Sequence, residues 1–467
     1  MNIISRYFSF LLLSFTLFAC SHDESSQEQK AAAAAAKKLY ADEVAEAANQ
    51  LIDIIPPDQR RSLVYPFDSD SRVYGKDTTQ TPSFCAVLAW CLPGWGLQQS
   101  DMNHDQLVAM HKLFNLALSS GGYQTLLAVL NRQRIIGEME EKGDTQFLKD
   151  VLHKHPHAHE HSVFDFDHSH IPDSSFYPAV AGGYANGEVK WVWDSVPGLA
   201  KRREQFDEYT LAIFGTPGRN TEWGFRFEGH HITFNMTFIT DQKTGEVDIH
   251  TTPLFFGAFP MIIPESPEAS KISQEWGWEE GQIMMYSVAH HLRKFWINLP
   301  EATRSRAFID SSYFTQSPPI ILDTPMPFMI GSLDPRVDSL KIDKYPHLKV
   351  SPSELSSEAK WHLKQAYQFY VNAMNSNLSP DYIERIDEAL DAREQLTLSW
   401  AGQSLQQEGS HHYSYLLVDN LLLEFMQSNQ FSIQHDPSVT GNHVHSMLRD
   451  LKFDWLDPMS LHLRRSH

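Results

Sequence analysis

The chain has 467 residues, with 38 Lys and Arg against 58 Asp and Glu, which gives a formal net charge of −20. Hydrophobic residues make up 42% and aromatic residues 12%, so the composition excludes a chain that is disordered throughout. The acidic balance argues against a nucleic-acid partner, because neutralising phosphates requires clustered Lys and Arg. The unusual feature is the count of 24 His beside only 3 Cys. The sequence therefore raises the question of whether histidines converge on one site.

The N-terminal segment predicts a secretion signal over residues 1–19. It carries one charge, Arg6, before an apolar run that is too short to span a bilayer, since a spanning helix needs about 20 apolar residues. The signal ends in Leu17-Phe18-Ala19-Cys20, which resembles the lipobox of bacterial lipoproteins. We therefore expect a lipid on Cys20 that anchors the protein in the cell envelope, and Ser21 resembles a sorting signal for the outer membrane. An ordinary cleaved signal is the alternative.

After the signal, the sequence predicts a tether that is followed by one long domain. Residues 20–45 are polar and then rich in alanine, which is typical of a tether, and residues 46–467 are predicted to form the domain. The alanine run at 31–36 could instead begin a first helix that continues through Leu51.

The two remaining cysteines, Cys85 and Cys91, lie six residues apart. Outside the cytoplasm they could form a local disulfide, and two buried thiols are the alternative. No Cys-x-x-Cys pattern occurs, which excludes a zinc site made of thiolates.

Hydrophobic periodicity predicts the main elements in chain order. Amphipathic helices are predicted over residues 106–118, 123–141, 279–299 and 353–374. Alternation predicts strands in two clusters, at 230–238 and 246–252 and then at 411–418, 421–426 and 442–448. Together they predict an α+β fold, one large domain in which helices pack on a mixed or antiparallel sheet.

Two groups of histidines are predicted to lie at the surface. An insertion at about 144–200 holds seven His and is predicted to be an exposed loop that could bind metal loosely. His290 and His291 lie in the predicted helix 279–299 beside Arg293 and Lys294, and there a solvated face is predicted.

The first predicted hairpin carries a polar row. The alternation of residues 230–238 places His231 and Asn235 on the face opposite the core. In the register that keeps Val247 and Ile249 on the apolar face, His250 joins this polar row. His230 should point toward the core, where a satisfied core histidine is one interpretation and a further metal ligand is the other.

The C-terminal strands carry the sharpest local features. Glu424 lies in a continuous apolar run, where a carboxylate costs several kcal/mol unless it is paired, protonated or bound to a metal. A buried pair with Arg449 is one interpretation, and a metal ligand or general base is the other. In Asn442-His443-Val444-His445 the two imidazoles point to one face of a strand about 7 Å apart, which suits two ligands of one ion.

Several motifs in chain order resemble one known family. They are Ile213-Phe-Gly-Thr-Pro217, Trp223-Gly-Phe-Arg226-Phe-Glu228-Gly-His-His231, Thr252-Pro-Leu-Phe-Phe-Gly257-Ala258 and Asn442-His-Val-His445-x-x-x-Arg449-Asp450. Over about residues 70–467 the chain is similar to the mostly secreted bacterial family known as domain of unknown function 3500. The family name carries no activity, but the resemblance implies that the Glu-Gly-His-His and Asn-His-x-His motifs belong to one pocket.

These residues predict a metal-dependent enzyme, with hydrolysis favoured over oxidation because a zinc-type site needs no redox partner. The predicted ligands of a zinc or other first-row divalent ion are His231, His412, His443 and His445, with His230 as a further candidate. Glu424 or Asp450 would be a ligand or base, and Arg449 and Asn235 would orient an oxyanion. The alternatives are a non-catalytic lipoprotein that binds a small ligand or metal, and a structural protein of the envelope.

Overall fold

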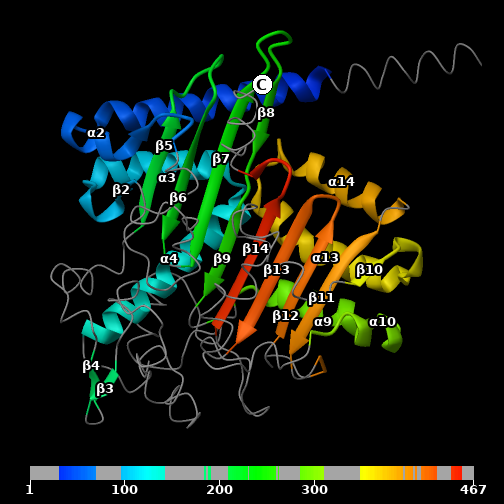
Figure 1. Cartoon of the computed structure of the whole chain (residues 1–467). Coiled ribbons are helices and arrows are strands. Elements are labelled where there is room, and N and C mark those ends of the chain that lie inside the picture. Colours follow the sequence, from blue (N-terminus) through cyan, green and yellow to red (C-terminus); the bar gives the residue numbers. More distant parts are fainter. Residues whose placement is uncertain are drawn as a thin grey trace, which may run out of the picture.

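The structure is a computed structural model, and the residues that it describes hold a large sheet with its helices (Figure 1). These residues are 31–69, 96–141, 183–185, 188–190, 209–229, 231–258, 261, 284–309, 348–392, 395–402, 405–406, 412–428 and 443–454. Cys20, Cys85, Cys91, His230 and the seven histidines of the predicted insertion lie outside them. The predicted lipid anchor, disulfide and loop therefore remain predictions.

Twelve strands form the central sheet. They are β1 (Val64–Tyr65), β2 (Leu97–Gln98), β5 (Thr210–Gly215), β6 (Trp223–Gly229), β7 (Ile232–Thr240), β8 (Val247–His250), β9 (Leu254–Ala258), β10 (Leu348–Val350), β11 (Leu396–Gly402), β12 (His412–Val418), β13 (Leu421–Ser428) and β14 (His443–Asp450). Their order is β1-β5-β6-β7-β9-β14-β13-β12-β11-β10, with β2 beside β5 and β8 beside β7. Within the described residues β1 and β5 are parallel and the other pairs antiparallel, so the sheet is mixed. A separate hairpin joins β3 (Gly183–Ala185) to β4 (Glu188–Lys190).

The centre of the sheet joins segments that are far apart in sequence. β9 pairs with β14, which brings Phe255 opposite Met447 and Gly257 opposite His445. Figure 1 shows this junction as the green β9 beside the red β14. The predicted hairpin clusters are therefore two halves of one sheet.

Helices cover one face of this sheet. They are a first helix at residues 31–54, then α2 (Pro57–Leu63), α3 (His104–Ala117), α4 (Ser120–Glu141), α9 (Tyr286–Ile297), α10 (Glu301–Arg306), α13 (Ser357–Ala373) and α14 (Ser379–Asp391), with short 3₁₀ turns η2 (Gln99–Asp101) and η8 (Pro352–Glu354). The ring of Phe114 in α3 lies 4.6 Å from that of Phe227. The indole Nε1 of Trp296 in α9 donates to Ser414 Oγ at 2.8 Å. Both sheet residues point to the same side, which we call the helix-covered face.

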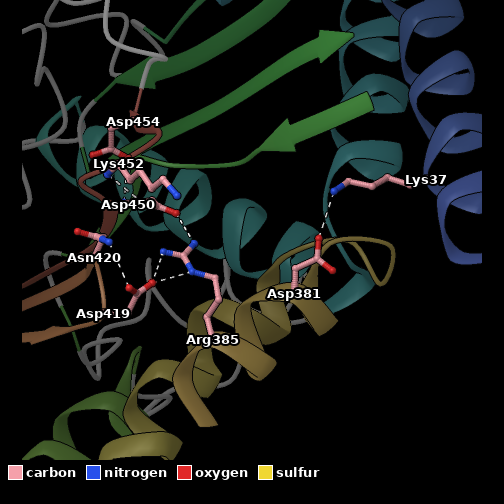
Figure 2. A network of polar contacts seen from close by, with 8 residues as sticks. All are labelled: Lys37, Asp381, Arg385, Asp419, Asn420, Asp450, Lys452 and Asp454. Carbon is pink, nitrogen blue, oxygen red and sulfur yellow. Dashed lines mark hydrogen bonds and ion pairs between the residues drawn. The ribbon is translucent and has the colours of Figure 1, made fainter. Parts of the chain in front are cut away.

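A polar network holds α14 against the end of the sheet (Figure 2). Arg385 of α14 donates to Asp419 in the turn between β12 and β13, with Nη2 to Oδ2 at 2.7 Å, and also to Asp450 at the end of β14. At the other side of the network, Lys37 Nζ of the first helix lies 3.1 Å from Asp381 Oδ2. The network therefore joins the N-terminal helix, α14 and the C-terminal strands.

The structure confirms the predicted α+β fold and most predicted elements. Helices 106–118, 123–141 and 353–374 correspond to α3, α4 and α13, and the predicted helix 279–299 begins later, at Tyr286 of α9. The hairpin β7–β8 has the predicted register, because Phe238 lies opposite Ile249 and Thr237 opposite His250. The alanine run does begin a helix, so the second part of the predicted tether is helical.

Among the longer elements, β5, β6, β9, β11 and α14 were not predicted, and neither were the short elements α2, α10, β1, β2, β3, β4 and β10. The strands β5, β6 and β9 are buried along nearly their whole length, so they lack the clean alternation that identified β7. Among the described residues, no helix combines the length and the apolar character needed to cross a membrane.

Candidate functional site

The two faces of the sheet differ in chemistry. Apolar side chains make up most of the helix-covered face, which also carries a few buried polar residues such as Ser414. The opposite face carries polar and charged side chains that each expose at most 4% of their surface. We call this the polar face and define it by Thr210, Arg226, Glu228, His231, Thr233, Asn235, Ser399, Tyr413, Tyr415, Glu424, His445 and Arg449. Burying polar groups costs free energy, and the stability of the fold does not require it. A buried polar face is therefore a candidate for a functional site.

One row of residues crosses the polar face from β5 to β11. Its members lie directly opposite one another on eight neighbouring strands: Thr210, Glu228, Thr233, Phe255, Met447, Glu424, Tyr415 and Ser399. Side chains at such positions have their Cβ atoms about 4.5–5.5 Å apart. Among the described residues, the hydroxyls of Thr210 and Thr233 have no hydrogen-bond partner. An unpaired buried hydroxyl is costly, so both are candidate contacts for a ligand.

His231 and His445 lie side by side on the polar face. Their ring centroids are 5.0 Å apart with an interplanar angle of 52°. His445 is on β14, whereas His231 lies in the turn between β6 and β7 and adopts a left-handed backbone with φ of 65°. The alternation of residues 230–238 predicts a strand position for His231, but β7 begins at Ile232. The pairing of β9 with β14 brings the two imidazoles together, as the resemblance implied for their two motifs.

Gly257 of β9 provides the space for this pair. Its N–H donates to the carbonyl of His231 at 2.8 Å. A Cβ at this position would lie 2.7 Å from Cδ2 of His231 and 2.9 Å from Cδ2 of His445. The absence of a side chain at residue 257 therefore allows both rings to occupy this position.

Glu424 lies on the same face as the histidine pair. Tyr413 of β12 donates its hydroxyl to Glu424 Oε1 at 2.9 Å, and Met447 lies directly opposite Glu424 on β14. Arg449, the partner that the sequence suggested, is on the same face and donates to Asp454. Burial raises the pKa of Asp454 although Arg449 opposes this shift. The carboxylate of Glu424 is thus held next to the site by a tyrosine.

Asn235 fixes the chain that leads into β9. Its Nδ2 donates to the carbonyl of Pro253 at 2.8 Å, and Arg226 lies directly opposite on β6. This contact holds one of the two amide hydrogens of Asn235, so the other remains able to contact a ligand.

Arg226 and Glu228 form a buried ion pair that the sequence analysis did not include. Arg226 Nη2 lies 2.9 Å from Glu228 Oε1, and both side chains expose at most 2% of their surface. The guanidinium carbon of Arg226 also lies 5.6 Å from the ring centroid of Phe214. The signal was present in the sequence, because Phe225-Arg226-Phe227-Glu228 alternates between apolar and charged residues.

A comparison with protein families decides where this chain belongs. The family described as "Protein of unknown function (DUF3500)" matches residues 37–456. The chain belongs to this family. No curated protein and no solved structure matches the chain. The DUF3500 match contains every residue of the polar face, in agreement with the resemblance of the sequence motifs.

In this DUF3500 chain His412 lies apart from the other candidate ligands. It is on the helix-covered face, where its Nε2 lies 2.6 Å from Ser414 Oγ. Burial, assisted by the positive charge of Arg293, lowers the pKa of His412 well below its usual value, so this imidazole is neutral. The alternation of β12 places its side chain on the other side of the sheet from His445, which corrects the predicted grouping.

Asp450 also lies apart from the histidine pair. It has the same orientation in β14 as Val444 and Leu448, which point to the helix-covered face. Its carboxylate accepts from Arg385 and from the N–H of Lys452, the latter at 3.2 Å (Figure 2). Asp450 therefore fixes α14 to the sheet, whereas the prediction placed it in the metal site.

The predicted metal set is only partly assembled in the described DUF3500 fold. His231 and His445 meet, and His443 occupies the register position opposite Ser428, two residues before His445. Within the described residues, no group of three or more His, Cys, Asp or Glu is arranged to hold a metal ion. The pair and its neighbour Glu424 are the part of the prediction that the fold brings to one face.

Proposed function

We propose that this protein is a hydrolytic enzyme whose active site is the polar face, with His231 and His445 as its central pair. The observation that carries the proposal is the contact of these two buried imidazoles, 5.0 Å apart, between the two halves of the sheet. Neutral imidazole is the side chain best suited to accept and return a proton near neutral pH. A small polar substrate fits a face whose buried hydroxyls, Thr210 and Thr233, lack partners among the described residues.

A divalent ion is the finer part of the proposal. Zinc or another first-row ion would take His231 and His445 as ligands, because neutral imidazole is a common ligand of these ions. Glu424, on the same face, would be the carboxylate that activates a water molecule or completes the site. Within the described residues the fold provides two imidazoles for the ion, so the metal-dependent form of the proposal requires a further ligand.

The test of the proposed function is turnover by single-histidine variants. We expect the wild-type protein, with and without added zinc, to hydrolyse a substrate from a panel of esters, phosphates and glycosides. His445→Gln should lower kcat/KM on the order of 100-fold, since loss of a general base or ligand removes at least that much. The exposed His104 at the start of α3 provides the control, and His104→Gln should leave turnover unchanged.

Two results separate the alternatives. Equal turnover by His445→Gln and wild type would contradict a catalytic role for the pair. No turnover on any substrate, together with ligand-dependent thermal stabilisation that His445→Gln abolishes, would favour the non-catalytic binding protein. Loss of turnover on chelation, restored by zinc, would support the metal-dependent version.

The proposed location is the cell envelope, with a lipid on Cys20. The support is the Leu17-Phe18-Ala19-Cys20 pattern after an apolar signal. Stable anchoring takes more than one acyl chain or an acyl chain with a second membrane-binding signal. We expect Cys20→Ala to shift the protein from the membrane fraction to the soluble fraction of fractionated cells. A wild-type protein whose mature N-terminus carries no lipid by mass spectrometry would contradict this proposal.

A further inference from the structure

A second pair of histidines meets between two helices, away from the polar face. His291 of α9 and His362 of α13 point toward each other, with their Nδ1 atoms 3.0 Å apart and their ring centroids 5.2 Å apart. His290 lies beside them, with its ring 5.3 Å from that of His291. The sequence analysis predicted a solvated face here, whereas His290 and His291 are half-buried and His362 is buried.

We propose that His291 and His362 bind a first-row divalent ion with affinity for imidazole, such as Zn²⁺ or Cu²⁺, and that this ion links α9 to α13. Two ligands of a tetrahedral zinc ion with Zn–N bonds of about 2.0–2.1 Å have nitrogens about 3.3 Å apart. The 3.0 Å between the two Nδ1 atoms is close to this spacing. Rotation of both rings away from their mutual hydrogen bond would direct the two Nδ1 lone pairs at one ion.

The protonation state favours binding. Burial, with the nearby His362 and His290, lowers the pKa of His291 to about 4, and burial also lowers the pKa of His362. Both imidazoles are therefore neutral near pH 7, the form that binds a metal. Glu358 contributes a negative charge on α13, and Lys294 contributes a positive charge on α9. Without the ion, one Nδ1 can donate its hydrogen to the other.

The remaining coordination positions would be filled by water. Among the described residues no three His, Cys, Asp or Glu are arranged around one ion, so the protein contributes two ligands here. His290 is the nearest further imidazole, with its ring 6.5 Å from that of His362. Such a site binds less tightly than a closed structural zinc site with four protein ligands.

The ion would stabilise the layer that supports the sheet. α9 contacts the sheet through Trp296 and Ser414, and α13 through the hydroxyl of Tyr367, which donates to the carbonyl of Leu416 at 2.8 Å. An ion that binds both helices when the protein is folded, and does not bind the unfolded chain, raises the stability of the folded state. The site lies on the helix-covered side, so it is separate from the proposed active site.

Titration of the full, metal-free chain with ZnCl₂ and with CuCl₂ tests the site. We expect His291→Gln and His362→Gln each to bind one ion fewer than wild type and to show a smaller zinc-dependent rise in Tm than wild type. The His104→Gln control should retain both. Replacing the seven histidines of residues 144–200 with Gln in every protein removes binding by that segment. Equal stoichiometry and an equal rise in Tm in wild type and both variants would overturn the proposal.

A measurement on the wild-type protein covers the case in which a variant does not fold. A saturating concentration of zinc should protect His291 from carbethoxylation by diethyl pyrocarbonate, read by peptide mass spectrometry, and should leave the exposed His104 reactive. Equal modification of His291 with and without zinc would overturn the proposal. His291→Gln should keep its turnover, and His445→Gln should keep the part of the zinc-dependent rise in Tm that His291→Gln loses, so the two proposals can fail independently.

Discussion

Replacing Glu228 with alanine is expected to lower the free energy of unfolding by about 3–5 kcal/mol, the usual cost of removing one partner of a buried ion pair. The guanidinium of Arg226 would remain buried beside Phe214 without the carboxylate that now lies 2.9 Å from it. The carboxylate of Glu228 then no longer offsets the desolvation cost of that charge. Urea-induced unfolding, followed by circular dichroism at pH 7, measures the change.

An exposed ion pair provides the matched control for Glu228→Ala. Lys364 Nζ lies 2.6 Å from Asp387 Oδ1 on the surface of α13 and α14, and the two side chains expose 33% and 46% of their surface. Asp387→Ala should change the free energy of unfolding by less than about 1 kcal/mol, because water replaces the lost partner. If Glu228→Ala lowers the free energy of unfolding as little as Asp387→Ala does, the ion pair of Arg226 with Glu228 does not stabilise the fold.

Replacing Gly257 with alanine is expected to disrupt the histidine pair without removing either imidazole. The added Cβ would lie 2.7 Å from Cδ2 of His231 and 2.9 Å from both Cδ2 of His445 and the backbone oxygen of Val444, so both rings and the facing backbone of β14 must move. If the proposed function is correct, a displacement near 1 Å at the catalytic pair lowers kcat/KM on the order of 100-fold. The overpacking should also lower the free energy of unfolding by about 1–3 kcal/mol.

Gly121 is the control for Gly257→Ala, because a Cβ there meets nothing nearer than 3.7 Å. Gly121 is exposed in the first turn of α4, so Gly121→Ala should leave turnover unchanged and stabilise the helix slightly. Steady-state turnover and urea-induced unfolding of both variants provide the comparison. Full turnover in Gly257→Ala would show that the contact of the two rings is not needed for the reaction.

The alternation of apolar and polar residues was sufficient to predict a strand where one strand face is apolar and the other is polar. Residues 232–238 alternate, so the core face of β7 and the position of Asn235 could be predicted, and the turn at Gly245 supplied the register of β8. The same approach failed for β5, which is buried along almost its whole length and so lacks a polar face in the sequence. The ion pair of Arg226 and Glu228 was missed although its residues alternate with Phe225 and Phe227.

The sequence did not allow a correct prediction of which candidate residues lie together in one site. Glu424 was correctly expected to be buried, but His412 and Asp450 were assigned to the same site as His231 and His445 and lie elsewhere. On a strand, one step along the chain reverses the side on which a side chain lies. A predicted strand cluster therefore does not show which of its polar residues face one another.

The sequence by itself determined the α+β class, the main amphipathic helices, the hairpins and the membership in the DUF3500 family, because each depends on local periodicity or on ordered motifs. Only the tertiary structure decided that His231 meets His445, that Glu424 is held by Tyr413, and that His291 meets His362. These contacts join residues from distant strands and helices, and their formation depends on the pairing of β9 with β14 and the packing of α9 on α13. Such long-range choices reflect the burial and register of whole elements, which no short stretch of sequence contains.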